Sequence, residues 1–336
     1  MKHRIQFLRR RREFISLLGS AAAAWPIAAE AQQDRVRRIG VLMSLAEDDR
    51  QGQRYVAAFL HGLQDLGWKD GYNLRIDIRW GAADPDRIRG HASELVDLKP
   101  NVILAQSALA LARIERLTTI PIVFVQVVDP VGSGFVASLG RPRGNMTGFA
   151  DAEFSMSGKM LEVLKEIAPR VMRVAVFHNP VQAPQIAMWH AIEAVAPSLG
   201  VQVIPASPRD AAEIARTVEV LFANEPASGV IVLPNPITNL HRELIIALMA
   251  RNRLPAIYAY PYLVSEGGLV SYGTDPAGQF RQAAGYVVRI LTGAKPEDLP
   301  VQQPTKFQLA INLRTAKTLG LEIPPTLLAR ADEVIE

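Results

Sequence analysis

Short apolar segments of strand type alternate with helical segments along almost the whole chain, and this alternation limits the possible folds more than any other feature. The strand-like segments are residues 38–43, 74–78, 102–105 and 120–125, then a second series at 173–177, 201–204, 229–233 and 254–258. The helical segments are residues 53–66, 85–98 and 108–117, then 184–199, 211–223 and 238–251. Short apolar strands separated by helices predict parallel sheets with helices on both faces. The two series therefore predict an α/β protein of two Rossmann-like lobes.

Two segments rich in turn-forming residues, 140–148 and 266–273, interrupt the alternation and predict chain crossings between the lobes. Asp275-Pro276 then begins a helix that returns the chain to the first lobe. We therefore expect the first lobe to contain residues 36–146 plus about 275–300 and the second lobe residues 149–270, with residues 301–336 packing on the lobes. Two crossings form a hinge, which suits a cleft that closes on a ligand.

The first 31 residues have the features of an export signal. Arg9–Arg12 is followed by an apolar segment, 14–27, and by Ala29-Glu30-Ala31, a small-x-small cleavage pattern. The apolar segment is too short to span a bilayer, which takes roughly 20 residues. Residues 11–15, Arg-Arg-Glu-Phe-Ile, resemble a twin-arginine signal. The sequence predicts cleavage near Ala31 and a periplasmic protein, and leaves the choice of the twin-arginine or the general export route open.

The charge balance changes once this signal is removed. The chain has 37 Lys and Arg and 33 acidic residues, a net charge of +4. Residues 1–31 hold six of the basic and two of the acidic residues, which leaves 31 of each sign. A neutral mature protein has no strong field for nucleic acid or anionic membranes. The chain contains no Cys, so we expect no disulfide, no thiolate metal site and no lipid-accepting Cys.

Motifs for catalysis and for cofactors are mostly missing from the sequence. None of the six His forms a ligand pair, and there is no G-x-S-x-G or P-loop pattern. Residues 132–137 match the dinucleotide pattern G-x-G-x-x-A, with Asp151 about twenty residues on. This match follows the fourth strand, not the first, and Asp129-Pro130 interrupts the approach to the turn. We expect no cofactor, no metal and no enzyme, and the absence of a helix-turn-helix argues against a repressor.

Four segments carry a family resemblance: 11–19, 129–148, 267–273 and 299–325. Together they resemble the ABC transporter substrate-binding protein family, over essentially the whole chain, and in particular its tryptophan- and tyrosine-type members. The resemblance implies the type I periplasmic binding protein fold, with Venus-flytrap closure, and capture of a small solute for an ABC permease with its ATPase. Membrane contact would then occur only through the permease. Arg143 is a departure, since the family more often has Gly at this position.

The ligand is expected beyond the carboxyl ends of the strands, where open α/β sheets bind small molecules. The candidate ligand-binding residues are Ser44, Gln106, Ser107 and Asp129 in the first lobe and Asn179, Asn235, Tyr258 and Tyr272 in the second. Ser107 begins a helix whose N–H groups can hold a carboxylate, and Asp129 can pair with an ammonium. Tyr258 and Tyr272 belong to a cluster of four Tyr that offers apolar area. These features favour an amino acid or an aromatic or carboxylate compound.

Each of these residues also has an ordinary structural interpretation, because Ser, Asn and Asp at strand-to-helix turns commonly cap helices. The sequence favours the periplasmic solute-binding component of an ABC importer. A ligand sensor of the same fold is the alternative. An enzyme that uses the same cleft, with Asp129 and His178 as neighbours, is a weaker one.

Overall fold

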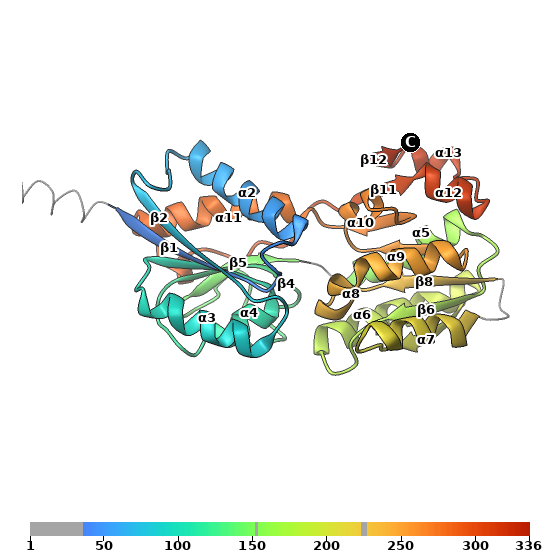
Figure 1. Cartoon of the computed structure of the whole chain (residues 1–336), viewed down its shortest axis with the longest axis horizontal. Helices are drawn as coiled ribbons and strands as arrows, with labels where there is room; N and C mark the ends of the chain where they lie inside the picture. The colour runs from blue at the N-terminus through green and yellow to red at the C-terminus, as the bar shows by residue number, and fades with distance from the viewer. Residues whose placement is uncertain (1–35, 152–153, 223–226) are drawn as a thin grey trace, which may run out of the picture.

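The computed structural model describes residues 36–151, 154–222 and 227–336 of the 336-residue chain. The export signal predicted at residues 1–31 lies outside these residues. Figure 1 shows two α/β lobes side by side, joined by connecting segments that run between them. Within the described residues, no helix is long and apolar enough to cross a membrane.

The first lobe is built on a five-stranded parallel sheet in the order β2-β1-β3-β4-β5. Its strands are β1 (Arg37–Met43), β2 (Leu74–Trp80), β3 (Val102–Gln106), β4 (Ile122–Val127) and β5 (Met146–Ala150). Its helices are α2 (Arg50–Asp65), α3 (Pro85–Asp97), α4 (Ser107–Ile114) and α11 (Pro276–Leu291). One apolar cluster joins α2 and α11 to one sheet face, and another joins α3 and α4 to the opposite face. Both faces are therefore covered, as the apolar strands require.

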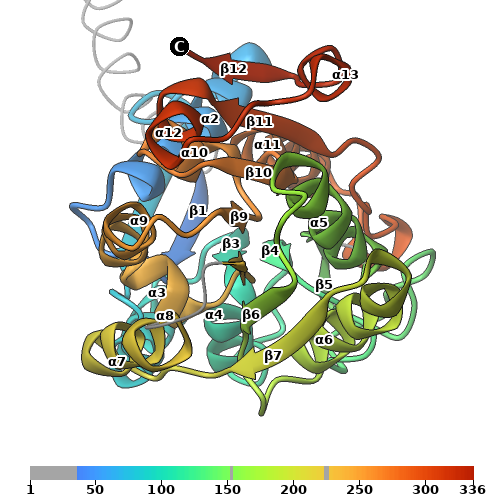
Figure 2. The same cartoon turned by 90° about the vertical axis from the view of Figure 1, so that its right-hand side faces the viewer.

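The second lobe is built on a seven-stranded sheet in the order β12-β11-β10-β9-β8-β6-β7. Its strands are β6 (Arg173–Phe177), β7 (Gln202–Ala206), β8 (Ser228–Val232), β9 (Ala256–Tyr258), β10 (Val270–Gly273), β11 (Gln308–Asn312) and β12 (Glu333–Ile335). Its helices are α5 (Phe154–Ile167), α6 (Ala183–Val195), α7 (Ala211–Phe222), α8 (Pro236–Leu240), α9 (Arg242–Arg251), α10 (Pro261–Ser265), α12 (Leu313–Leu319) and α13 (Pro325–Leu328). Figure 2 shows α5 and α6 on one side of this sheet and α7, α8 and α9 on the other.

The predicted α/β fold with two parallel-dominated sheets is confirmed. One pair of strands departs from it, since β11 runs antiparallel to β10. The helix predicted over 238–251 is divided at His241 into α8 and α9, because the backbone of His241 leaves the helical conformation (φ −103°, ψ 23°). The strands β11 and β12, which lie in the predicted C-terminal segment, extend the second sheet.

The crossings between lobes differ from the predicted positions. Strand β5 pairs with β4 in the first sheet as far as Ala150, so the chain leaves this lobe after residue 150 rather than within 140–148. Strand β10 belongs to the second sheet, so the return crossing follows Gly273. A third crossing, beyond the short 3₁₀ helix Pro296–Asp298, runs beside the first: Gln302 N–H donates to Gly148 O, and Ala150 N–H donates to Gln302 O. The hinge therefore contains three connections.

Candidate functional site

A cavity of about 480 Å³ lies between the two lobes and is lined by residues from both. The first-lobe wall contains Ser44, Leu45, Ala82, Ala83, Gln106, Ser107, Leu109, Gln126 and Phe135. The second-lobe wall contains Gln182, Pro184, Gln185, Pro234, Asn235, Pro236, Asn239, Leu240 and Tyr260. Asp151, just beyond β5 at the first crossing, lies at the cavity as well. A concave and largely apolar space with a few fixed polar groups has the character of a small-molecule site.

Polar side chains of the first-lobe wall bond to one another. Gln106, at the end of β3, accepts two hydrogen bonds at its Oε1, from Ser44 N (2.9 Å) and from Ser44 Oγ (2.5 Å). Its Nε2 donates to Gln126 Oε1 at 2.9 Å. The three residues come from the ends of β1, β3 and β4, which are neighbours in the sheet. This network fixes the orientation of the wall before any ligand is present.

The backbone of the first-lobe wall is strained. Ala82, Ala83, Ser107 and Gln126 have φ values of 50°, 57°, 76° and 57°, in the left-handed region that side chains disfavour. All four line the cavity. In the described part of the second lobe, Arg253 is the residue other than glycine that has a positive φ, and it does not line the cavity. Strain of this kind costs of order 1–3 kcal/mol per residue and concentrates at functional sites.

Helix α4 begins at the cavity without a side-chain cap from any described residue. Gln106 occupies the N-cap position, but its side chain is used in the bonds to Ser44 and Gln126. Ser107 Oγ accepts only a long hydrogen bond, 3.5 Å, from Ala110 N. The uncapped N-terminus of α4 can therefore bind an anionic ligand group, which the positive end of the helix also favours.

Polar groups of the second-lobe wall are mostly used in local structure. Asn235 caps α8 by accepting from Ile237 N and Thr238 N, and Thr238 Oγ1 accepts from Asn235 N in return. Gln185 Nε2 donates to Pro234 O at 3.0 Å. The prolines of this wall have no N–H to offer. Leu240 is 55% exposed and provides a large apolar side chain beside the cavity.

The carboxylate of Asp151 is the most distinctive polar group of the cavity. Tyr260 Oη donates to its Oδ2 at 2.6 Å, and Thr274 Oγ1 donates to its Oδ1 at 3.0 Å. Burial raises the pKa of Asp151 above its ordinary value, and the two hydroxyl donors partly offset this. Burial and the nearby Asp151 raise the pKa of Tyr260, which keeps this phenol a donor. A cationic ligand group would stabilise the carboxylate here.

Comparison with known proteins assigns the family. A model of the ABC transporter substrate binding protein family matches residues 38–335. The chain belongs to this family. A tyrosine-binding protein of Clostridioides difficile is 27% identical to it over 270 residues, which are 79% of this chain and 76% of that protein. The predicted family membership is therefore confirmed.

Two solved structures show the same fold as this substrate-binding protein. A conserved domain protein of Vibrio cholerae superposes with a TM-score of 0.81 at 27% identity. An ABC domain of Streptococcus pneumonia, solved in complex with L-Trp, superposes with a TM-score of 0.81 at 23% identity. Each alignment covers 89% of this chain and 99% of the other. Proteins of this family bind small-molecule ligands and work with an ABC permease.

Four of the eight predicted ligand-binding residues of this family member line the cavity. They are Ser44, Gln106, Ser107 and Asn235. Asp129 and Asn179 are not among the lining residues. The side chain of Asp129 turns back to accept from Gly132 N at 2.8 Å, and the side chain of Asn179 accepts from Val181 N at 3.1 Å. Both side-chain oxygens therefore stabilise loops of their own lobes.

The two predicted tyrosines also lie away from the cavity. Tyr258 is 2% exposed and packs in the core between β9 and helices α7 and α9. Tyr272 stacks on Phe307, with 5.8 Å between ring centroids. The tyrosine that does line the cavity is Tyr260, which stacks on Tyr262 at 5.6 Å. The tyrosine cluster thus contributes one ring to the cavity, but not one of the two predicted.

Asp151 is the main residue that sequence reasoning missed as a ligand group. The sequence pattern indicates it only as the acidic partner of a dinucleotide motif, because the segment before it is rich in turn-forming residues. The signal was present in Met146–Ala150, a short segment that forms β5 and places Asp151 beyond its carboxyl end. His178, the other residue considered for catalysis, is buried and stacks on Trp189 at 5.5 Å. No group of three or more potential metal ligands occurs in the part of the chain described by the structure.

Proposed function

We propose that this protein captures an aromatic amino acid in the cavity between its lobes and delivers it to an ABC permease for import. The carrying observation is that one largely apolar cavity contains both the buried carboxylate of Asp151 and the uncapped end of α4. A zwitterionic amino acid has the two complementary charges. Its ammonium would bind Asp151, and its carboxylate would bind the N–H groups at Ser107.

The apolar part of the cavity supports a ligand with a large side chain. Leu45, Leu109 and Phe135 of the first-lobe wall face the same cavity as Leu240 and the prolines of the second. Burying an aromatic ring against such surfaces is favourable by about 25 cal/mol per Å². The tyrosine-binding relative and the L-Trp complex support the same ligand class.

The transport role and the location belong to the same proposal. The predicted signal at residues 1–31 and the family support a periplasmic protein that receives its ligand outside the inner membrane. We also propose that the ligand leaves chemically unchanged, since capture and release are all that a permease requires. The permease with its ATPase is the expected partner, and no nucleic acid is expected.

Isothermal titration of the purified protein with L-Trp, L-Tyr, L-Ala and a neutral sugar tests the proposal. We expect micromolar binding of the aromatic amino acids, about −8 kcal/mol, and weaker binding of L-Ala. The deamino analogues, indole-3-propionate and 3-(4-hydroxyphenyl)propionate, should bind roughly 10- to 100-fold more weakly, because the charge-assisted bond to Asp151 is lost. Binding of the sugar but of none of the amino acids would contradict the assignment. Recovery of an altered ligand would contradict the role as a carrier.

A further inference from the structure

Three charged side chains join the lobes, and one of them, Asp49, also lines the ligand cavity. Arg242, the first residue of α9, places its Nη1 2.7 Å from Asp49 Oδ2, across the gap to the first lobe. Its Nε lies 3.1 Å from Glu266 Oε2, in its own lobe. Gln51 Nε2 of the first lobe donates to Glu266 Oε1 at 3.4 Å. We call Asp49, Arg242 and Glu266 the interlobe triad.

The interlobe triad is shielded from solvent. The side chains of Asp49, Arg242 and Glu266 are 10%, 13% and 25% exposed. Shielded ion pairs interact more strongly than surface pairs, and loss of one partner leaves an uncompensated charge. The other oxygen of Asp49 is also used, because Oδ1 caps α2 through Gln51 N and Gly52 N. Every part of the triad is therefore held by further bonds.

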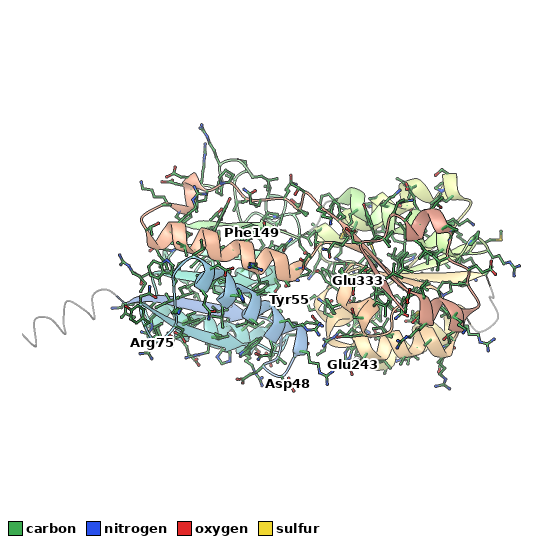
Figure 3. The ribbon with its side chains drawn as sticks, turned by 90° about the horizontal axis from the view of Figure 1, so that it is seen from above. Asp48, Tyr55, Arg75, Phe149, Glu243 and Glu333 are labelled. Carbon is green, nitrogen blue, oxygen red and sulfur yellow. The ribbon has the colours of Figure 1, made fainter. Side chains whose placement is uncertain are left out.

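Two members of the triad, Arg242 and Glu266, lie away from the ligand cavity, whereas Asp49 lines it. Asp48 and Glu243, the sequence neighbours of Asp49 and Arg242, are labelled in Figure 3 and lie on the facing edges of the two lobes. Opening of the hinge would separate Arg242 from Asp49, whereas Glu266 would stay with Arg242 because both belong to the second lobe.

We propose that Arg242 is a positioning residue that holds the lobes closed and sets ligand affinity without touching the ligand. Glu266 orients the guanidinium in the open state, so little side-chain freedom is lost when Asp49 arrives. A closed state favoured in this way raises apparent affinity, because a ligand that bridges the lobes binds only the closed fraction tightly. Arg242 and Glu266 are thus part of the closing device and not of the ligand site.

Arg242→Met tests this inference, with Arg281→Met as the matched control. Arg281 forms an ion pair of the same 2.7 Å length with Asp65, but both residues lie in the first lobe and are 59% and 46% exposed. In ligand-free protein, Arg242→Met should increase the radius of gyration measured by X-ray scattering. It should also weaken L-Trp binding roughly tenfold, mainly through faster dissociation in stopped-flow measurements. Arg281→Met should change neither quantity.

Further variants distinguish closure from a general loss of structure. Arg242→Lys keeps the charge, so it should bind L-Trp more tightly than Arg242→Met does. It should still bind more weakly than the wild type, because an ammonium cannot contact both carboxylates in the geometry of a guanidinium. Glu266→Gln should shift both quantities in the same direction as Arg242→Met, by less. The affinity readout rests on the proposed function, whereas the radius of the ligand-free protein does not. A wild-type radius and a wild-type dissociation rate in a folded Arg242→Met protein would overturn the inference, even if L-Trp binds as proposed.

Discussion

The first-lobe wall of the cavity has side chains bonded to one another on a strained backbone, whereas the second-lobe wall has prolines, Leu240 and the capped end of α8. Ser44, Gln106 and Gln126 form one network, and Gln126 itself has a positive φ. In the second lobe, Asn235 is used for its own helix. The difference indicates that the two walls have different roles. We propose that the first lobe recognises the polar groups of the ligand and that the second lobe adds apolar contact when the hinge closes.

Asp151→Asn should have the largest effect on binding, because Asp151 lies at the hinge, where both walls meet. The substitution keeps the size of the side chain but removes the charge that would hold a ligand ammonium. Affinity for L-Trp should fall roughly 10- to 100-fold by titration calorimetry. Asp129→Asn is the control, since Asp129 lies outside the cavity lining and should keep wild-type affinity. Equal losses in both variants would contradict the placement of the site.

Acidification should reproduce the loss without a mutation. Ligand binding requires ionised Asp151, so affinity should be constant at neutral pH and fall as the pH drops through the pKa of Asp151 in the free protein. Burial raises this pKa, so the loss should begin above the range of an exposed Asp, whose pKa is about 3.9. The slope should reach about one decade per pH unit. The Asp151→Asn protein should show a flat profile, and a flat wild-type profile down to about pH 4 would contradict the role of the carboxylate.

Paired substitutions in the two walls test their proposed roles directly. Gln106→Met breaks the polar network, and we expect it to weaken binding of all amino acids by about tenfold, whatever their side chain. Leu240→Ala removes apolar contact, and we expect a loss of about 3- to 10-fold for L-Trp but little change for L-Ala. Titrations with both ligands measure the ratio of affinities. If Gln106→Met changes the ratio of the L-Trp and L-Ala affinities and Leu240→Ala leaves it constant, the roles assigned to the two walls would be reversed.

The smallest expected effect concerns backbone strain. Ala83→Gly and Arg143→Gly both place Gly at a positive φ, 57° and 59° in the structure. Each should raise the free energy of unfolding by about 0.5–1 kcal/mol, measured by urea denaturation. Arg143 is exposed and does not line the cavity, so its variant should keep wild-type affinity. Ala83→Gly should weaken binding slightly, because the strained wall becomes more mobile. Unchanged stability in both variants would mean that the strain is not stored at these positions.

The Gly that the family resemblance predicts at position 143 would fit the same geometry. A residue with φ of 59° favours Gly, so Arg at this position costs some stability. The residue precedes β5, so it lies before the first crossing and not within it. The hinge itself is built from the segments after Ala150, after Gly273 and around Gln302.

Periodicity in the sequence predicted β1 to β4, β6 to β9, most of the helices and the two α/β series, because each short apolar strand has to be buried on both faces. It missed β5, which lies in a segment rich in turn-forming residues, and the strands β10 to β12. Strand ends in turn predicted Ser44, Gln106, Ser107 and Asn235. The rule failed for Asp129 because β4 ends at Val127, and two further residues turn the carboxylate toward Gly132. It failed for Tyr258 because this residue lies within β9 and its side chain packs in the core against α7 and α9.

Tertiary structure alone decided the contacts that join distant segments. The carboxylate of Asp151 accepts hydrogen bonds from Tyr260 and Thr274, which are 109 and 123 positions away in the sequence. Asp49 and Arg242 are 193 positions apart and pair only because the hinge brings the lobes together. Local pattern specifies which face of a strand or helix is apolar. It carries no information about which two polar residues will share a buried space, because that depends on how the two lobes pack against each other.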